Sequence, residues 1–286
     1  MALSHSIAPV LGFAHLTDLP CYQLVCGEAT AVISPYGAHL LSYQPKSGVE
    51  LLYLSPETQW QNNTPIRGGV PVCWPWFGPA ADVFNPGQQK LANHGVVRNQ
   101  FWQLTNQQSS ETEVSLSFEI QTSSLPYAHA PAFLRLTLSL TPEHLTLKLS
   151  SDHGIQQAAL HSYFAVAGIE HAVVSPLRGD FIDKVKGGQQ HQTEPDLRFA
   201  EEIDRVYQTT ADQLTLATGL HQINIKQQQH DASVLWNPWS AKAASLKDLP
   251  DQGYLHFVCV ETARLSLTND SALELVQQLS YNPQLE

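Results

Sequence analysis

Three short stretches between residues 114 and 149 decide the fold: Val114-Ser-Leu-Ser-Phe-Glu-Ile120, Leu134-Arg-Leu-Thr-Leu-Ser-Leu140 and Leu145-Thr-Leu-Lys-Leu149. In each of them, apolar residues alternate with polar ones. Strict alternation places the apolar side chains on one face of a β-strand and the polar side chains on the other. Turn-forming residues such as Thr141-Pro-Glu143 separate the stretches. The pattern therefore predicts an antiparallel meander with one buried face.

Weaker strand signals extend from this meander toward both ends of the chain. The candidates are Ala29–Ile33, Gly219–Lys226, Ser233–Trp236 and His256–Leu267. Ala272–Leu279 fits either a short helix or one more strand, and the polar segment 187–204 predicts a long loop. A β-α-β rhythm is absent, and proline and glycine are spread along the chain without a linker-like block. We therefore expect an all-β fold with few short helices, a large β-sandwich that forms a single domain over residues 1–286.

The composition limits the classes of partner. Charged residues make up 14% of the chain and the net charge is −11, which argues against nucleic acid or an anionic membrane as a partner. The four cysteines form no C-x-x-C pair, the first residues lack a secretory signal, and no apolar run is long enough to span a membrane. We expect a cytoplasmic protein with free thiols. We also expect a monomer, because no exposed apolar stripe stands out.

The segment from Arg67 to Pro79 departs most clearly from simple alternation, since it holds three prolines, three glycines and three large aromatic residues. Such a segment cannot be regular strand throughout. Aromatic rings and an arginine suit a sugar pocket, because a pyranose packs its apolar face on a ring. The alternative is that Trp74, Trp76 and Phe77 fill the core. Arg67 is the stronger candidate for binding, because the glycines that follow it allow a ligand to approach the backbone closely.

Two further positions carry polar groups that suit ligand binding. His94 and Arg98 are four residues apart, so on a strand they would share one face and point to one pocket. A guanidinium pairs two oxygens of a phosphate or carboxylate. The alternative is that both side chains lie on the surface. Asp204 is a weaker candidate, as a carboxylate that accepts hydrogen bonds from a ligand.

His161 and Glu261 each interrupt an apolar stretch. Imidazole titrates near neutral pH and is suited to general acid–base catalysis, although a histidine among apolar residues is more often a core residue. Glu261 follows four apolar residues in a predicted strand, and partial burial would raise its pKa and make it a stronger base. The alternative for Glu261 is a strand-end carboxylate that faces solvent. Signatures of serine hydrolases, zinc proteases and nucleotide-binding proteins are absent, and no H-x-H pair suggests a metal site.

Together these segments resemble the aldose 1-epimerase family, and within it the glucose-6-phosphate 1-epimerase (hexose-6-phosphate mutarotase) branch. The matching pieces, in chain order, are Tyr36–Ser42, Arg67–Pro79, His94–Arg98, Leu160–Phe164, Phe181–Val185, Asp204–Tyr207, Val234–Trp239 and Cys259–Glu261. Their joint order covers nearly the whole chain, and the Arg67–Pro79 segment is the most specific of them. The segment His-Gly-Val-Val-Arg98 departs from the family, which usually has Phe-Ala before the arginine.

The resemblance implies a large twisted antiparallel β-sandwich with its site on a concave face. By similarity, His161 is the catalytic acid and Glu261 the catalytic base, and Arg67, His94, Arg98 and Asp204 bind the substrate. The implied substrate is a small phosphosugar, a hexose 6-phosphate whose α and β anomers interconvert by ring opening and closing. That reaction requires no metal or cofactor. In an acidic protein, Arg67 and Arg98 would supply the local positive charge that a phosphate needs. Three alternatives remain: a sugar-phosphate sensor on the same fold, a glycoside hydrolase or lyase in which Glu261 and Asp204 form the carboxylate pair, and a structural β domain.

Overall fold

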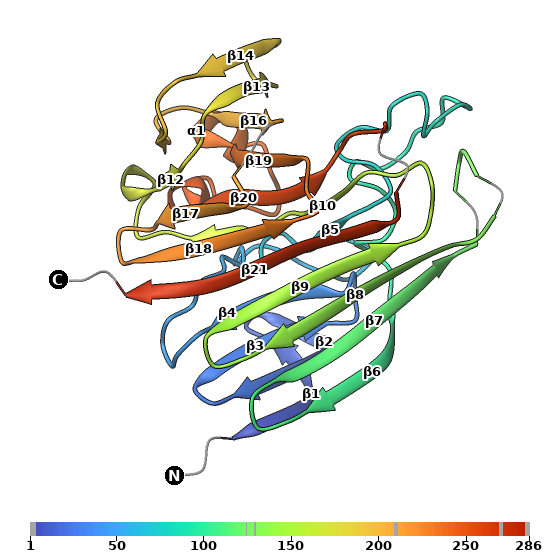
Figure 1. The fold of residues 1–286 in the computed structure, drawn as a ribbon, viewed down its shortest axis with the longest axis vertical. Coiled ribbons are helices and arrows are strands. Elements are labelled where there is room, and N and C mark those ends of the chain that lie inside the picture. The colour runs from blue at the N-terminus through green and yellow to red at the C-terminus, as the bar shows by residue number, and fades with distance from the viewer. Residues whose placement is uncertain (1–3, 124, 129, 209–210, 269–270, 284–286) are drawn as a thin grey trace.

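The computed structural model describes residues 4–123, 125–128, 130–208, 211–268 and 271–283. Within them the strands form three sheets (Figure 1). The four-stranded sheet holds, in spatial order, β1 (His5–Phe13), β2 (Leu16–Cys26), β3 (Ala29–Ser34) and β4 (His39–Gln44). The eight-stranded sheet holds β14 (Gln189–Gln192), β13 (Gly179–Asp183), β16 (Ile203–Tyr207), β19 (Ala232–Asn237), β20 (Phe257–Arg264), β10 (Ala158–Leu160) and β5 (Val72–Cys73), with β11 (Tyr163–Ala165) also paired to β20. The nine-stranded sheet holds β15 (Leu197–Arg198), β12 (Val173–Ser175), β17 (Gln213–Ala217), β18 (His221–Gln228), β21 (Leu273–Pro283), β9 (His144–Ser151), β8 (Ala132–Leu140), β7 (Val114–Thr122) and β6 (Gln103–Ser109).

The predicted meander is confirmed in β7, β8 and β9, which are antiparallel neighbours in the nine-stranded sheet. The apolar residues of the alternation face the core. Leu116, Leu138 and Leu147, for example, lie side by side on the three strands, and at most 1% of each is exposed. Burial of one continuous leucine-rich face is the hydrophobic gain that holds this sheet against the rest of the molecule.

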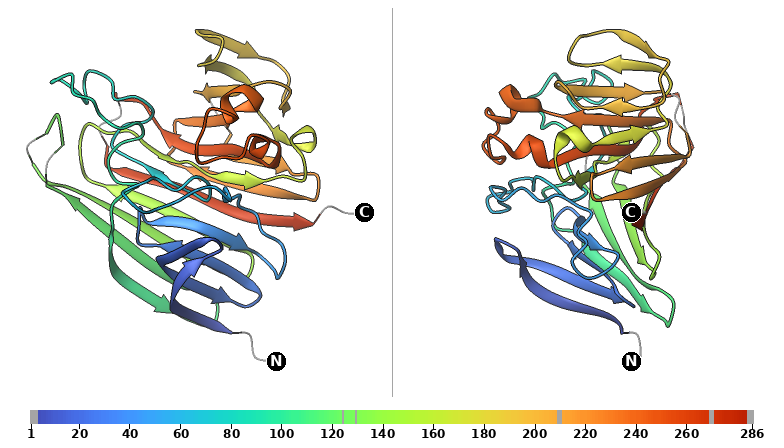
Figure 2. Two further views of the ribbon diagram at one scale, coloured as in Figure 1. Left: turned by 180° about the vertical axis from the view of Figure 1, so that it is seen from behind. Right: turned by 90° about the vertical axis from the view of Figure 1, so that its left-hand side faces the viewer.

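The sheets pack in two layers. The nine-stranded sheet forms one layer, and the four- and eight-stranded sheets lie behind it, as the two further views show (Figure 2). Leu40 of β4 bridges Val70, just before β5, so the two smaller sheets meet along one edge. The largest cluster of buried apolar residues draws on all three sheets. The predicted fold class, an antiparallel β-sandwich, is confirmed.

Two segments resolve or correct the sequence interpretation. The segment Ala272–Leu279 is strand from Leu273 onward, because its alternation places Leu273, Leu275 and Leu279 of β21 in the core. The segment 187–204 is not one loop: it contains β14 and β15 and the start of β16. These strands are short and mostly polar because much of their surface is exposed at sheet edges, so the apolar signal that marks a buried strand is missing.

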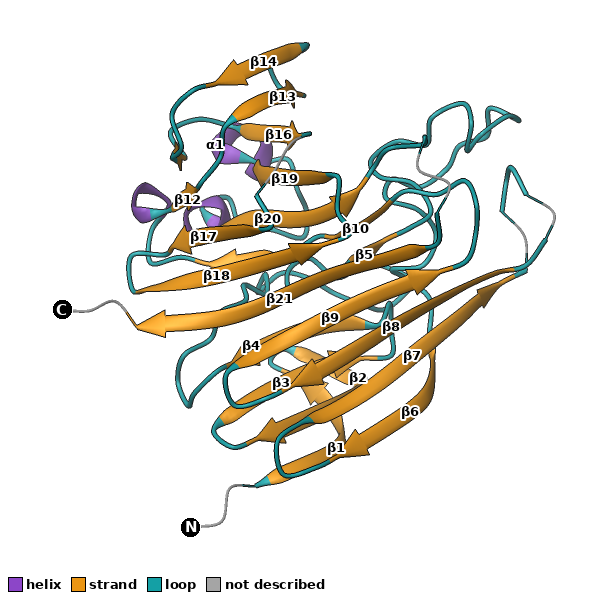
Figure 3. Ribbon diagram, in the orientation of Figure 1, coloured by secondary structure: helices purple, strands orange, loops and turns teal. Residues whose placement is uncertain are grey.

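Helical structure is sparse among the described residues. It consists of one α-helix, α1 (Trp239–Ala243), and two 3-10 turns, η1 (Ile169–His171) and η2 (Gly253–His256) (Figure 3). The expectation of few short helices is confirmed. No described helix is long and apolar enough to cross a membrane.

Candidate active site

A cavity of about 340 Å³ lies at the eight-stranded sheet and gathers all six site residues predicted from the sequence. These are Arg67, His94, Arg98, His161, Asp204 and Glu261. They come from positions up to 194 residues apart in the chain, so the tertiary fold alone brings them together. The other lining residues are Phe77, Gly78, Pro79, Asn93, Tyr163, Lys184, Val234, Trp236, Lys242 and Leu246.

His161 and Glu261 lie opposite each other on neighbouring strands. β10 and β11 both pair with β20, with Leu160 opposite Thr262 and Tyr163 opposite Cys259. The same register continued across the gap places His161 opposite Glu261. Residues directly opposite in an antiparallel pair have their side chains on the same face and close together. The Nε2 atom of His161 lies 3.4 Å from Oε1 of Glu261.

Both groups are buried, and burial disfavours the charged form of each. Glu261 is 1% exposed and His161 8% exposed. Desolvation raises the pKa of the Glu261 carboxyl well above its usual value, although Lys184 opposes the shift. Desolvation also lowers the pKa of His161 well below its usual value, with smaller contributions from His94, Arg98 and Arg67. Nδ1 of His161 and Oε2 of Glu261 have no hydrogen-bond partner among the described residues, so both atoms are free to act on a ligand.

An aromatic side chain sets the plane of the His161 ring. Tyr163 stacks on it with ring centroids 4.9 Å apart and an interplanar angle of 11°. The Tyr163 hydroxyl accepts a hydrogen bond from Nη1 of Arg67 at 3.2 Å. Arg67 in turn forms an ion pair with Asp248, with Nε 2.8 Å from Oδ1. Arg67 is therefore held in place by two partners before any ligand binds.

His94 reaches the cavity from a turn and not from a strand, so the sequence argument that put His94 and Arg98 on one strand face is wrong. His94 has a φ of 65° and Gly95 a φ of 81°, which no regular strand contains. Gly95 is required there, because a Cβ atom would lie 1.8 Å from the carbonyl oxygen of Trp74. The turn still directs both side chains into the cavity.

The protonation state of His94 follows from its surroundings. Burial lowers its pKa to about 3, with smaller contributions from Arg98 and Lys184, so the ring is neutral at pH 7. Its Nδ1 accepts a hydrogen bond from the backbone N–H of Gly78 at 3.3 Å. A neutral ring that accepts at Nδ1 carries its proton on Nε2. His94 is therefore suited to donate a hydrogen bond to a ligand oxygen.

The cavity reverses the acidic balance of the chain. Four of its lining residues are cationic, namely Arg67, Arg98, Lys184 and Lys242, and two are acidic. Lys242 pairs with Glu202 at 2.8 Å, and Lys184 lies 3.8 Å from Asp204 and 4.7 Å from the ring centroid of Phe77. Arg98 forms no ion pair with any described residue, which leaves its charge available to a ligand.

Sequence reasoning missed several residues of the cavity. Lys184 and Lys242 gave no local signal, because a lone lysine in a polar segment is usually a solvated surface residue. Tyr163 follows His161 by two residues, and the alternation could have placed both on one face. Of the three aromatic residues proposed to fill the core, Trp74 and Trp76 do so, whereas Phe77 lines the cavity.

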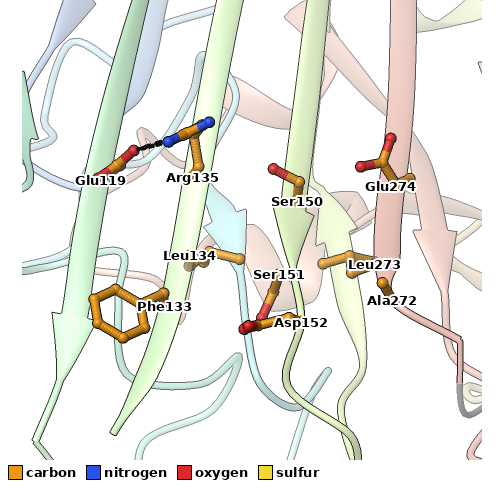
Figure 4. A pocket seen from close by; sticks show the side chains of 10 residues that line it. All are labelled: Glu119, Phe133, Leu134, Arg135, Ser150, Ser151, Asp152, Ala272, Leu273 and Glu274. Carbon is orange, nitrogen blue, oxygen red and sulfur yellow. Dashed lines mark hydrogen bonds and ion pairs between the residues drawn. The ribbon is translucent and has the colours of Figure 1, made fainter. Parts of the chain in front are cut away.

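A second hollow lies on the nine-stranded sheet and differs in chemistry. Figure 4 shows its side chains on β7, β8, β9 and β21 and on the residues directly next to β9 and β21, with Arg135 joined to Glu119. Arg135 donates to the Glu119 carboxylate from Nε at 2.6 Å. Histidine does not occur among the lining residues, and Arg135 is the one cation there. No three histidine, cysteine or acidic side chains in the described part of the chain are placed to hold a metal ion together.

The fold is a β-sandwich whose cavity holds a buried histidine–glutamate pair and four cationic side chains, groups that are chemically able to transfer protons and to attract an anion. The aldose 1-epimerase family model matches residues 20–273. The chain belongs to the aldose 1-epimerase family.

Two relatives and one solved structure show the similarity in more detail. The chain is 38% identical to an Escherichia coli K12 protein named "Putative glucose-6-phosphate 1-epimerase", over 92% of this chain and 89% of that one. A Salmonella typhimurium protein of the same name is 35% identical over 96% and 93% of the two chains. The crystal structure of a "putative mutarotase" from Salmonella typhimurium superimposes with a TM-score of 0.85 at 32% identity and covers 97% of each chain.

Proposed function

We propose that this protein interconverts the α and β anomers of a hexose 6-phosphate, with glucose 6-phosphate as the preferred substrate. The observation that carries the proposal is the His161–Glu261 pair, 3.4 Å apart at a cavity lined by four cationic side chains. The names of the relatives from Escherichia coli and Salmonella typhimurium support the choice of glucose 6-phosphate.

In the proposed mechanism, Glu261 acts as the base and takes the proton of the O1 hydroxyl. His161 acts as the acid and donates a proton to the ring oxygen. The C1–ring oxygen bond breaks, the open aldehyde rotates about the C1–C2 bond, and the ring closes on the other face of the carbonyl. On closure the two residues exchange roles, so the enzyme returns to its starting state. Each positioned proton transfer contributes about 10²–10⁴ in rate.

The geometry suits this reaction because O1 and the ring oxygen are bonded to the same carbon atom. An acid and a base that serve two such neighbouring oxygens must themselves lie side by side, as His161 and Glu261 do. A glycoside hydrolase needs two carboxylates about 5–9.5 Å apart that flank the bond. The residue paired with Glu261 is a histidine, which favours anomer exchange over hydrolysis.

The two pKa shifts place the resting proton of the pair on Glu261, so the proposed mechanism starts once that proton has passed to His161. A carboxyl group with a raised pKa is the stronger base once it is ionised, and an imidazole with a lowered pKa is the stronger acid once it is protonated. Burial produces both shifts. The neutral pair and the ion pair hold the same number of protons, so one proton can pass between them without exchange with bulk water.

We propose that Arg98 binds the phosphate, with Arg67 as its neighbour in the cavity. Arg67 already pairs with Asp248 and donates to Tyr163, whereas Arg98 has no ionic partner among the described residues. A free guanidinium can form two hydrogen bonds to phosphate oxygens. His94, through Nε2, and Asp204 would then bind sugar hydroxyls.

The test is anomer exchange of glucose 6-phosphate measured by NMR magnetisation transfer, with free glucose and galactose in parallel. We expect exchange of the phosphosugar in the wild type and its loss in Glu261→Gln and His161→Ala. Glu119→Gln is the matched control, because it removes a carboxylate from the other sheet. Equal activity on free galactose would contradict the phosphate assignment. Binding of the phosphosugar without exchange would leave the sugar-phosphate sensor as the function.

Three expectations from the sequence belong to the same proposal: a cytoplasmic location, a monomeric state, and a single domain over residues 1–286. All four cysteines are buried and free, which suits a reducing compartment. The core cluster shared by the three sheets supports a single cooperative unit. Light scattering and a single coincident unfolding transition would test the last two.

A further inference from the structure

A buried polar network lies directly behind the His161–Glu261 pair, on the opposite face of the same strands. Its members are Ser162, Gln227, Ser233, Thr262 and Gln277, and each is at most 1% exposed. Ser162 follows His161 in the chain and Thr262 follows Glu261. Because successive residues of a strand point to opposite faces, these two hydroxyls point into the core where the acid and the base point into the cavity.

The network joins the two layers of the sandwich. Ser162 donates to Oε1 of Gln277 at 2.6 Å, and Nε2 of Gln277 donates to the Thr262 hydroxyl at 2.9 Å. Thr262 donates in turn to Oε1 of Gln227 at 2.9 Å. The hydroxyls belong to the eight-stranded layer, and the two glutamines lie side by side on β18 and β21 of the nine-stranded sheet.

The two glutamines occupy positions where the core otherwise takes apolar residues. Gln227 continues the buried series Ile223 and Ile225 on β18, and Gln277 stands between the buried Leu275 and Leu279 on β21. A buried amide is costly unless its hydrogen bonds are made, and here they are made between side chains. A leucine would fill such a position without any hydrogen bond, so packing alone does not account for the two glutamines.

The backbone hydrogen bonds around His161 indicate what the glutamines contribute. Regular pairing is interrupted between β10 and β11, where the Ser162 N–H bonds to the carbonyl of Leu160, only two residues back. The turn takes the Ser162 N–H out of the ladder with β20, although the Ser162 carbonyl still accepts from the Val260 N–H at 3.2 Å and the His161 N–H donates to the Pro71 carbonyl at 3.0 Å. The hydrogen bonds that join Ser162 and Thr262 to the same Gln277 side chain add a side-chain constraint where the Ser162 N–H bond to the ladder is missing.

We infer that Ser162, Thr262 and Gln277 are positioning residues that fix the separation of His161 and Glu261 through a shared buried hydrogen-bond network. The inference rests on the proposed acid–base function of the pair. A misplacement of about 1 Å at a catalytic group can lower the rate by about 100-fold, so the network acts on kcat and leaves substrate binding largely unchanged.

The test compares Thr262→Val, which keeps the shape and removes the hydroxyl, with Thr262→Ser, which keeps the hydroxyl. We expect kcat for anomer exchange to fall about 10- to 100-fold in Thr262→Val with KM changed less than about threefold, and to be rescued in Thr262→Ser. Thr122→Val is the matched control, a buried threonine of β7 whose loss should leave kcat unchanged. Unchanged kcat in a folded Thr262→Val variant, or an equal loss in both Thr262 variants, would overturn the inference.

A second readout does not depend on activity. The imidazole ¹⁵N resonances of His161 report its tautomer and its contact with Glu261. We expect them to shift or broaden in Thr262→Val and Ser162→Ala but not in Thr262→Ser. If the wild type has no anomerase activity, the proposed function fails while this comparison still supports or overturns the positioning role. His161 resonances identical in all variants would overturn it.

Discussion

The two faces of the strands around His161 and Glu261 differ in whether their buried polar groups are paired. On the cavity face, Nδ1 of His161 and Oε2 of Glu261 are buried and lack a hydrogen-bond partner among the described residues. On the core face, one residue further along each strand, Ser162 and Thr262 donate their hydroxyl protons to glutamine amides. The cavity keeps polar groups unpaired for a substrate, and the core pairs them to hold the strands in place.

This difference separates the polar groups that stabilise the fold from the polar groups whose unpaired atoms reduce its stability. A buried polar atom without a hydrogen-bond partner lowers the free energy of unfolding by about 1–3 kcal/mol. A catalytic site tolerates this loss because the substrate later supplies the partner. A fully paired network carries no such cost. Substitutions on the cavity face should therefore impair catalysis more than folding, and substitutions on the core face should impair folding as well.

The largest effect is expected for Glu261→Gln. Loss of the base should lower the rate of anomer exchange by about 10²–10⁴. The same change should raise the free energy of unfolding at pH 7, because the raised pKa means that folding makes the carboxyl take up a proton, a cost that Gln removes. NMR exchange and urea denaturation measure the two effects. A Glu261→Gln variant that loses both activity and stability would show that the carboxylate is structural.

The next effect concerns the phosphate. Replacing Arg98 by Met should remove a charge-assisted hydrogen bond worth about 1.5–3 kcal/mol and raise KM for glucose 6-phosphate by about 10- to 100-fold. Exchange of free glucose should change little. Arg205→Met is the matched control, because Arg205 pairs with Asp183 and packs on Phe181 outside the cavity. An equal rise in KM for both sugars would assign Arg98 to the hexose and not to the phosphate.

On the core face, Gln227→Leu should lower the free energy of unfolding by about 1–3 kcal/mol for each hydroxyl whose proton is left without an acceptor. Those hydroxyls belong to Ser233 and Thr262. Gln228→Leu is the control, since Gln228 is the next residue of β18 and faces solvent. Urea denaturation measures both variants. Equal stability of the two would mean that the buried network contributes nothing to folding.

A smaller effect is expected from pH. The pKa of His161 is lowered and that of Glu261 raised, so the pair holds one proton over the whole interval between the two. We therefore expect kcat to stay flat through about pH 6.5, where an ordinary histidine titrates. The contribution of the pair to stability should be flat between about pH 4.3 and 6.5, where the unfolded pair also holds one proton. It should fall above about pH 6.5, where the unfolded pair holds no proton, and below about pH 4.3, where the unfolded pair holds two. A kcat that falls with a midpoint near pH 6.5 would contradict the lowered pKa.

The smallest effect is expected on the outer sheet face of Figure 4. Glu119→Gln removes a partly exposed ion pair with Arg135, and such pairs contribute about 0–1 kcal/mol. Anomer exchange should be unchanged. Loss of activity in this variant would extend the functional region to the nine-stranded sheet.

Local patterns were enough to predict much of the fold. The alternation at 114–149 predicted β7, β8 and β9, because half-buried strands impose a period of two on the sequence. The short polar strands β14 and β15 were missed, since strands at exposed edges carry little apolar signal. Resemblance to the family predicted the six cavity residues. Lys184 and Lys242 were not predicted as cavity residues, because neither has a local sequence environment that distinguishes it from a surface lysine.

The sequence by itself determined that residues 114–149 form three strands, which face of those strands is buried, and which residue types could move protons or bind a phosphate. Only the tertiary structure decided that His161 stands opposite Glu261 and that buried glutamines lie behind the two residues. It also decided that Arg67 is already paired, whereas Arg98 has no ion-pair partner in the described part of the chain. The physical reason is that alternation and composition act over a few residues, whereas strand register, burial and the pKa shifts that follow depend on contacts between segments far apart in the chain.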